Sequence, residues 1–395
     1  MRIDIIFPTL PPTLDGIGDH TARLAAALAA HEEVQVRILT AEPDARPIPG
    51  VTIERAFVTS PASGVRSLFD AVAASPPDLL LLEFNQFSYG RWGLNPFLPW
   101  TLRRIRRACP TTRVAWMAHE DFVPPTSWSY LVMRQWQRWQ FKALGRLSDL
   151  IFFSIDPWVQ QYASWFPNTP VFHLPVASNM PRVDAPQAAA RAALGVSPSA
   201  FVAGVFGTMN PSRLLSHIRA AAQALHAACD DFLLLYVGPD GAALRRGIGA
   251  VPMIDLGILP AFQVSLSFRA MDLHLAPFID GVSTRRGSFL VGMQHGVAGL
   301  STFGPLTDDL LADSRGTGLF LTDLLNDEDA SATSFAASAV AALGAPEQRR
   351  AVGQAGRALY DTHLSLDVSV RRLLKAAHTV VHAAAPNSSP VLIDS

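Results

Sequence analysis

The sequence has few cysteines and few charged residues, and each shortage excludes a class of protein. Two cysteines in 395 residues, Cys109 and Cys229, cannot make a disulfide framework or a zinc site. We expect both to be ordinary thiols of a reducing compartment. Charged residues make up only 16% of the chain and the formal net charge is −1, so the basic excess that nucleic-acid binding requires is missing.

Long apolar runs are also missing. No uninterrupted run approaches the roughly 20 apolar residues of a membrane-spanning helix. Asp4 places a charge in MRIDIIF, where a secretory signal peptide would have its apolar core. We therefore expect a cytoplasmic protein, at most peripheral on the inner face of a membrane.

What the sequence does contain is a regular alternation of short apolar runs with helical patterns, which is typical of β-α-β units around parallel sheets. The apolar content of 49% is enough to fill the cores of two to three domains of roughly 150 residues each. The run LLLLEF is apolar throughout, so we expect it to be buried on both faces of a sheet. The predicted strands are 2–7, 34–39, 79–84, 113–118, 150–154, 201–207, 232–238, 252–257, 272–277 and 297–302.

The alternation is interrupted once, at residues 181–199, which are rich in Pro and Ala and contain no strand pattern. We interpret this segment as a linker between residues 1–180 and 200–362. The predicted fold class is therefore α/β, with two doubly wound Rossmann-like domains facing across a cleft. We expect a C-terminal helix over 363–384 that crosses back to the first domain, and a flexible tail over 385–395.

A glycine-containing loop follows the first predicted strand. Gly16 and Gly18 stand next to the start of a helix, where backbone N–H groups and the helix dipole favour an anionic oxygen. A tight turn with Asp19 as a helix cap explains the same residues equally well.

Polar residues follow two other predicted strands of the first domain, at the carboxyl ends where open α/β sheets bind ligands. His119 comes directly after strand 113–118, and its imidazole can titrate near neutrality. A core histidine and an ordinary polar loop are the alternative interpretations. The other candidate site residues of this domain are Glu83, Asn85, Tyr89 and Glu120.

The second domain offers a candidate for binding a diphosphate. Two guanidinium groups, hydroxyl groups and a glycine stand together before an apolar helix, which favours an anion at the helix N-terminus. A solvated loop end is the alternative interpretation. The residues are Ser283, Arg285, Arg286, Gly287 and Ser288.

Six motifs in order along residues 1–384 resemble the retaining GT-B glycosyltransferases of the family 4 type, which assemble bacterial surface polysaccharides and glycolipids. The order of the six motifs carries the resemblance, since none of them is strongly specific alone. They are DGIGDHTARLAAAL, MAHED, LIFFSIDPWVQQY with VFHLPVASN, VFGTMNPSR, LYVGPDG, and APFIDGVSTRRGSFLVGMQHGVAGLST.

The resemblance implies an enzyme of the hexosyltransferase type that moves a sugar, with retention, from a nucleotide-sugar donor to a glycan, lipid-linked or small-molecule acceptor. Asp280 would hold hydroxyls of the donor sugar, and His119 would orient the sugar or the acceptor. The departing diphosphate would be stabilised by Arg213, Arg285, Arg286 and the loop from Gly16 to Gly18.

Two departures from the family pattern accompany the resemblance. Thr208 stands where the family often has the first residue of a basic pair, of which Arg213 is the second. Ser288 stands eight residues after Asp280, where the family has its second glutamate. These departures keep two other functions open, a non-catalytic protein that binds a sugar nucleotide or glycan, and a GT-B epimerase or sugar-phosphate synthase.

We expect neither a cofactor nor a metal ion. The acidic run Asp327, Glu328 and Asp329 stands at the front of an apolar-periodic helix, where caps and first-turn carboxylates are expected on grounds of stability.

A basic segment rich in tryptophan lies in the first domain. Residues 91–146 contain ten basic residues against two acidic ones, and all 8 tryptophans of the chain fall between Trp92 and Trp165. One interpretation is a helix that binds anionic lipid, which would give weak peripheral contact with a membrane. The other interpretation, which the pattern favours slightly, is a helix that packs its Trp face on the sheet and leaves its basic stripe in water. The basic stripe consists of Arg134, Arg138, Lys142 and Arg146, and the Trp face consists of Val132, Trp136, Trp139, Ala143 and Leu147.

Overall fold

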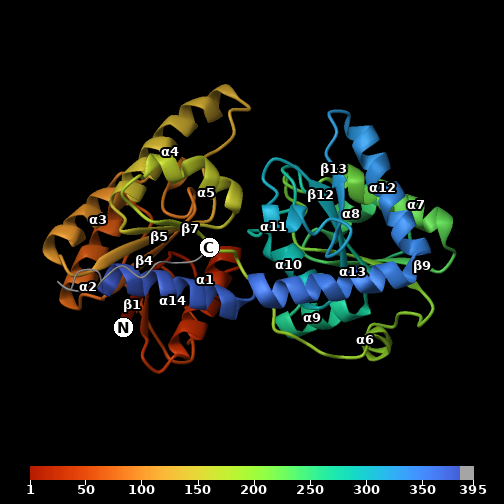
Figure 1. The fold of residues 1–395 in the computed structure, drawn as a ribbon, viewed down its shortest axis with the longest axis horizontal. Coiled ribbons are helices and arrows are strands. Elements are labelled where there is room, and N and C mark those ends of the chain that lie inside the picture. Colours follow the sequence, from red (N-terminus) through yellow and green to blue (C-terminus); the bar gives the residue numbers. More distant parts are fainter. Residues whose placement is uncertain (383–395) are drawn as a thin grey trace. The chain divides into compact units, whose positions relative to one another are not determined.

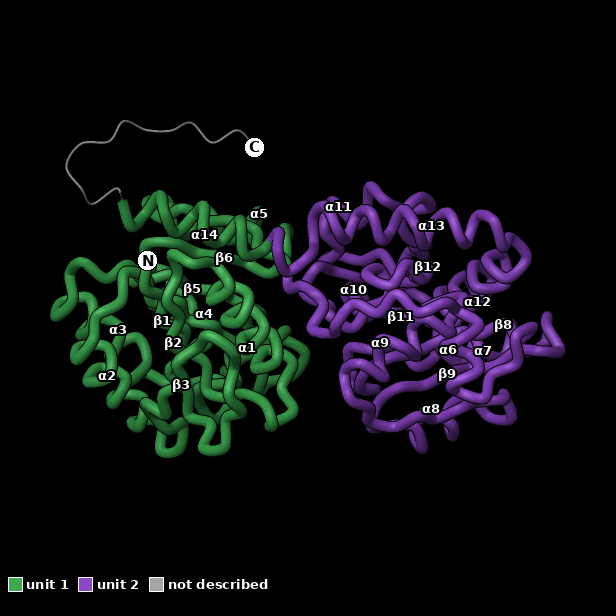
Figure 2. Tube along the Cα trace, turned by 90° about the horizontal axis from the view of Figure 1, so that it is seen from below, with its two compact units in different colours: residues 1–175, 369–395 green, residues 176–368 purple. Residues whose placement is uncertain are grey.

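The computed structural model describes residues 1–382, which fold into two compact units (Figure 1). Unit 1 comprises Met1–Pro175 and the chain from Ser369 onward, and unit 2 comprises Val176–Val368 (Figure 2). The tail expected over 385–395 lies outside the described residues.

Unit 1 is built on a seven-stranded sheet in which every neighbouring pair of strands is parallel. The strand order is β3-β2-β1-β4-β5-β6-β7. Figure 1 shows α4 and α5 on one side of this sheet and α1 and α14 on the other. The strands are β1 Arg2–Ile6, β2 Gln35–Thr40, β3 Val51–Arg55, β4 Leu79–Phe84, β5 Arg113–Ala118, β6 Leu150–Phe153 and β7 Val171–His173; the α-helices are α1 Gly16–Ala29, α2 Leu68–Ala74, α3 Phe97–Ala108, α4 Trp128–Arg146, α5 Asp156–Tyr162 and α14 Leu366–His382.

Unit 2 repeats this architecture with six parallel strands in the order β10-β9-β8-β11-β12-β13. The strands are β8 Phe201–Phe206, β9 Phe232–Val237, β10 Met253–Asp255, β11 Leu273–Ala276, β12 Ala298–Phe303 and β13 Phe320–Asp323; the α-helices are α6 Gln187–Ala193, α7 Leu215–Ala228, α8 Gly241–Ile248, α9 Ala261–Ala270, α10 Gly287–Gln294, α11 Asp309–Ala312, α12 Glu328–Gly344 and α13 Pro346–Leu359.

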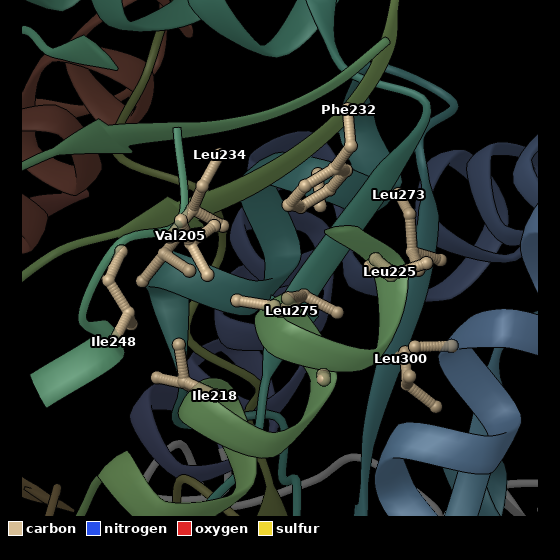
Figure 3. Packing of buried hydrophobic residues seen from close by; sticks show 14 of the residues in the cluster. Val205, Ile218, Leu225, Phe232, Leu234, Ile248, Leu273, Leu275 and Leu300 are labelled. Carbon is tan, nitrogen blue, oxygen red and sulfur yellow. The ribbon is translucent and has the colours of Figure 1, made fainter. Parts of the chain in front are cut away.

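Buried aliphatic side chains hold the helices of unit 2 against its sheet. Figure 3 shows Val205, Leu234 and Leu275 on the strands facing Ile218 and Leu225 on α7. All five are completely buried. A second cluster packs α6, α9 and α10 through Ala190, Phe268 and Val291. The sheet is therefore covered on both faces, as the doubly wound prediction requires.

The strand predictions were accurate where the sequence is apolar throughout. Every residue of β4 is buried, which confirms that LLLLEF is covered on both faces. Three strands are absent from the predicted list, β3, β7 and β13. All three lie at sheet edges. The residues of β3 are half-buried or exposed, β7 has only three residues and β13 only four. Short edge strands give little apolar signal.

The boundary between the units differs from the predicted linker. Residues 181–199 belong to unit 2 and contain α6. Arg191 of this helix is 5% exposed and pairs with Asp272 at 2.6 Å. An alanine-rich segment can therefore be an integral part of a domain when its small side chains pack closely. The C-terminal helix expected over 363–384 is α14, which from Ser369 on belongs to unit 1.

Helix α4 is oriented differently from the favoured sequence interpretation. Trp139 and Val132, expected on the packed face, are 52% and 45% exposed. The buried face instead carries Gln137 and Gln140, whose side-chain oxygens accept hydrogen bonds from the backbone N–H groups of Val123 (2.9 Å) and Asn95 (2.7 Å). Buried backbone N–H groups of loops require a hydrogen-bond acceptor. Glutamine on the buried face of α4 supplies one.

The basic stripe on α4 does not simply extend into water. The guanidinium of Arg134 lies 4.5 Å from the ring centre of Phe122, and the ammonium of Lys142 lies 4.4 Å from that of Trp165. These contacts are cation–π interactions. They turn the basic side chains toward the aromatic rings of unit 1 and leave tryptophans of the same helix in solvent.

Candidate active site

Each sheet has one point where the strand order reverses, and the predicted site residues gather near these points. In unit 1 the reversal lies between β1 and β4, and in unit 2 it lies between β8 and β11. Ligands of open α/β sheets bind outside the carboxyl ends of the strands at such positions. Glu83 lies at the end of β4 in unit 1, and Asp280 follows β11 in unit 2.

In unit 2 the carboxylate of Asp280 accepts hydrogen bonds from two arginines. The Nη2 atom of Arg286 lies 2.7 Å from Oδ1 and 3.0 Å from Oδ2. Arg285 pairs with Oδ2. The structure therefore joins the carboxylate of Asp280 to Arg285 and Arg286, a contact that the sequence analysis did not predict. A carboxylate has about four acceptor positions, so Asp280, 20% exposed, retains capacity for a further hydroxyl.

A third guanidinium, that of Arg213, completes this arrangement. Its Nη2 donates to Ser288 Oγ at 2.9 Å and to the backbone oxygen of Phe206 at 2.6 Å. Arg213 is 8% exposed, and its Nη1 is buried with no hydrogen-bond partner among residues 1–382. Burial, and then the charge of Arg286, lower the pKa of Arg213 to about 9, so it remains protonated at pH 7.

The ring of Phe278 lies beside two of these guanidinium groups. The Cζ atoms of Arg213 and Arg286 are each 4.6 Å from its centroid. We call Arg213, Arg285 and Arg286 with Asp280 the arginine cluster. Three guanidinium groups and one carboxylate leave a formal surplus of two positive charges, which suits a dianionic ligand.

Helix α10 begins directly after the two adjacent arginines. Gly287 is its first residue, and no side chain caps its N-terminus. The first-turn N–H groups therefore add to the positive field of the arginine cluster. An added Cβ at Gly287 would approach only the Ala177 oxygen, at 3.9 Å, so this position leaves room for a ligand.

The other predicted donor residues of unit 2 lie at different depths. Ser283 is completely buried, and its hydroxyl has no partner among residues 1–382. Thr208 is exposed, and its hydroxyl accepts a hydrogen bond from Asn210 at 3.2 Å. Neighbouring Ser212 accepts a bond from Arg286 at 3.1 Å. Ser212 is therefore a cluster residue that the sequence did not single out.

In unit 1 the glycine loop is shaped mainly by its own hydrogen bonds. Asp15 caps α1, because its Oδ1 accepts from the N–H groups of Ile17 (2.8 Å) and Gly18 (3.0 Å). The cap is thus Asp15 and not Asp19. An added Cβ at Gly18 would lie 2.8 Å from the Thr9 oxygen, whereas one at Gly16 would meet nothing within 4 Å. Close packing requires glycine only at Gly18, and Gly16 borders open space.

His119 and Glu83 form a buried pair in unit 1. Their Nε2 and Oε2 atoms are 2.5 Å apart, and the residues are 4% and 0% exposed. The ring of His20, from α1, packs edge-on against His119 with centroids 5.4 Å apart. Burial lowers the pKa of His20 to about 4, which makes His20 neutral at pH 7.

The structure places Tyr89, Asn85 and Glu120, the other candidates on the acceptor side, in different surroundings. Tyr89 is completely buried, and its hydroxyl donates to the backbone oxygens of Glu83 (2.7 Å) and Ile6 (3.0 Å), so it belongs to the core. Asn85 accepts from the N–H of Phe87 at 2.8 Å and stabilises its own turn. Glu120 is exposed at the start of the loop after His119. Glu83 is the candidate whose carboxylate pairs with the ring of His119.

The residues that could hold a metal ion are His20, Glu83 and His119, which offer one ligand atom each within 4.8 Å of one another. Two histidines and a glutamate are a composition found in zinc sites. The separation of 2.5 Å between His119 and Glu83 is, however, a hydrogen-bond distance, which favours a shared proton over an ion between them. The acidic run after β13 serves another purpose, because Asp327 caps α12, as predicted.

His20, Ser212 and Phe278 are side chains at these sites that the sequence analysis did not single out. His20 stands in the first turns of α1, and Phe278 follows β11 within a continuous apolar pattern. An aromatic residue in such an apolar pattern is normally interpreted as part of the hydrophobic core. Its contact with two arginines depends on the path of residues 207–214, which no local pattern specifies.

No protein-family model matches the chain, and no curated protein matches it by sequence. Solved structures do match it. Sucrose-phosphate synthase from Thermosynechococcus elongatus superposes with a TM-score of 0.72 at 15% identity, over 97% of this chain and 100% of that one.

Two further structures give the same result. HepE from Anabaena, solved in complex with UDP-glucose, has a TM-score of 0.66 at 14% identity, over 96% of this chain and 100% of its own. WaaG, a glycosyltransferase involved in lipopolysaccharide biosynthesis, has a TM-score of 0.66 at 13% identity, over 98% and 100%. The fold is GT-B. The GT-B match spans nearly all of both chains, so both units of this protein belong to the fold.

Proposed function

We propose that this protein is a glycosyltransferase that uses a nucleotide-sugar donor. The observation that carries the proposal is the arginine cluster, which has a surplus of positive charge at the strand-order reversal of unit 2. HepE, of the same fold, is solved with UDP-glucose, which supports a uridine nucleotide as the first donor to test.

The reaction we propose retains the anomeric configuration, as in the family 4 enzymes that the motifs resemble. The bond between the anomeric carbon and the diphosphate oxygen breaks, and the acceptor hydroxyl oxygen forms the new bond to that carbon. The hydroxyl proton passes to the departing diphosphate. The chain then needs no nucleophile of its own and acts through positioning and electrostatic stabilisation.

The described residues divide these tasks. The guanidinium groups of Arg213, Arg285 and Arg286 and the start of α10 stabilise the negative charge that develops on the diphosphate. Asp280 holds the arginines in place and accepts a hydroxyl of the donor sugar. His119 orients the sugar or the acceptor. A role in polysaccharide or glycoconjugate biosynthesis is part of the proposal.

Incubation with labelled nucleotide sugars tests the function. Transfer of label to an acceptor or to water supports a glycosyltransferase. Binding without turnover would instead indicate a sugar-nucleotide-binding protein, and conversion of the sugar without an acceptor would indicate an epimerase. A thermal-shift screen with UDP, GDP, dTDP and ADP identifies the base, because a ligand at 100 times its dissociation constant adds about 2.7 kcal/mol of stability.

Transfer is expected to be independent of divalent metal. The arginine cluster can neutralise the departing diphosphate, and Asp327 caps α12. Activity should therefore be unchanged in EDTA, and Asp327→Asn with Asp329→Asn should lower the melting temperature more than the rate. Loss of activity in EDTA that added Mg²⁺ or Mn²⁺ restores would contradict this assignment of charge.

We also propose that unit 1 contacts the surface of an anionic membrane. No helix among residues 1–382 is long and apolar enough to cross a bilayer. The first turns of α4 nevertheless expose a group of large side chains, and Trp136 links this helix to a neighbouring loop by donating to the Trp92 oxygen at 3.0 Å. The exposed side chains are Trp128 (80%), Tyr130 (40%), Leu131 (39%) and Val132 (45%) on α4, with Phe87 (51%) and Trp92 (58%) before α3.

Vesicle flotation at low salt checks this contact. The wild-type protein should float with anionic vesicles and not with neutral ones, since attraction to the surface is worth about 1 kcal/mol per basic residue and is screened by salt. Trp128→Ser with Leu131→Ser should reduce flotation. Phe262→Ser is the matched control, because Phe262 is 60% exposed on α9 of unit 2. Flotation with neither kind of vesicle would contradict the contact, and equal flotation with both would show that basic residues do not contribute to it.

A further inference from the structure

Glu83 is a carboxylate in a position where stability alone favours an apolar residue. It follows four leucines in β4, and all six residues of that strand are buried. Glu83 itself is 0% exposed, and its Oε1 accepts no hydrogen bond from residues 1–382. A buried carboxylate is costly unless it is paired, and apolar replacements of buried ion pairs are often neutral or stabilising. The residue therefore calls for an explanation other than folding.

The partner of Glu83 is His119, whose backbone and ring are both held by hydrogen bonds. Its backbone N–H donates to the Phe84 oxygen at 2.9 Å, and its backbone oxygen accepts from the Ser154 hydroxyl at 3.2 Å. Its ring nitrogen Nε2 lies 2.5 Å from Glu83 Oε2. An ionised carboxylate can only accept a hydrogen bond, so an ionised Glu83 requires the proton to be on Nε2.

The neighbours of the pair leave this assignment intact. His20 is neutral at pH 7 because burial lowers its pKa to about 4, so it adds no positive charge beside Glu83. Tyr89 donates to the backbone oxygen of Glu83 and not to its carboxylate. Arg23, on α1, acts electrostatically on His20.

We infer that Glu83 is a positioning residue that fixes the tautomer of His119 and thereby makes its Nδ1 a hydrogen-bond acceptor for a substrate hydroxyl. The inference rests on the proposed function, because sugars and their acceptors offer hydroxyl groups at a glycosyltransferase site. When Nε2–H donates to Glu83, the neutral ring retains a lone pair on Nδ1. Carboxylates that orient a functional histidine in this way are a common arrangement around metal-bound and catalytic imidazoles.

The kinetic test is a double-mutant cycle between Glu83→Gln and His119→Ala. Glutamine matches glutamate in shape but does not impose one tautomer on the imidazole. We expect Glu83→Gln to lower kcat by about 10- to 100-fold with little change in KM for the donor. In the His119→Ala background the same change should cost nothing further, because Glu83 acts only through His119. Additive losses, or an unchanged kcat in Glu83→Gln, would overturn the inference.

Two measurements separate this role from a structural one. A structural ion pair predicts that Glu83→Gln lowers the melting temperature, whereas a positioning role predicts a melting temperature equal to or above that of the wild type. Glu83→Asp, which keeps the carboxylate, should recover part of the lost kcat. Tyr89→Phe is the control, because it removes a bond to the Glu83 backbone and leaves the carboxylate untouched; it should change stability without changing the tautomer of His119.

Nitrogen NMR of histidine side chains tests the tautomer directly in the wild-type protein and does not depend on activity. The His119 ring should be protonated at Nε2 in the wild type and should become a mixture of tautomers in Glu83→Gln. A wild-type ring protonated at Nδ1 would overturn the inference. If no labelled donor is turned over, the proposed function fails, and the NMR result still decides the role of Glu83.

Discussion

Arg285→Ala combined with Arg286→Ala is expected to weaken the binding of UDP, or of whichever nucleoside diphosphate the screen identifies, by about 10²- to 10⁴-fold. The estimate follows from charge-assisted hydrogen bonds, which contribute roughly 1.5 to 3 kcal/mol each. Both guanidinium groups are largely shielded from water, with side chains 12% and 15% exposed, so screening reduces their contribution only slightly. Isothermal titration calorimetry of the folded variant measures the loss.

The control for this variant removes an arginine from the same unit. Arg315 pairs with Asp323 at 2.6 Å on an exposed surface, and Arg315→Ala should leave nucleotide affinity unchanged. The double variant also leaves Asp280 without these partners, so Asp280→Asn should be added to restore charge balance. If the folded variants bind the nucleotide as tightly as the wild type does, the arginine cluster is not the diphosphate site.

His119→Ala is expected to lower kcat by about 10²-fold or more, because misplacing a reacting group by one ångström can cost this much. Nucleotide affinity should change far less, since His119 belongs to unit 1 whereas the arginine cluster belongs to unit 2. Steady-state kinetics gives kcat, and calorimetry with the nucleotide alone gives the affinity.

A surface histidine provides the comparison. His226 is exposed on α7, and His226→Ala should leave both quantities unchanged. A variant of His119 that loses nucleotide affinity and turnover to the same extent, or that unfolds, would show that His119 is structural.

The sequence predicts the strands well where burial is complete and poorly where it is partial. LLLLEF became β4 with the predicted bounds, because a strand covered on both faces must be apolar at every position. The edge strand β3 carries exposed and half-buried residues, so no such requirement marks it. On helix α4 the sequence analysis expected the wrong face to be buried. The buried face carries glutamines because their side chains accept hydrogen bonds from the backbone of separate loops, which the helix sequence alone does not indicate.

The candidate sites divide in the same way. Asp280, Arg285 and Arg286 are close in sequence, and the structure joins them. Their positions at strand ends made Glu83 and His119 candidates, but did not predict their contact with each other. Tyr89 was misassigned, because nothing local distinguishes a tyrosine that faces a ligand from one that bonds to backbone oxygens inside the core.

Unit 1 cannot be completed until the end of the chain has been synthesised, because its last helix, α14, follows unit 2 in the sequence. Val370, Leu373 and Ala377 of this helix are buried, and Ser369 donates to the Pro175 oxygen at 3.1 Å. During translation the seven strands of unit 1 leave the ribosome first, but the helix that covers them is made only after all of unit 2. Nascent unit 1 therefore keeps an apolar face open while its neighbour is synthesised and must be protected from aggregation until the last helix docks.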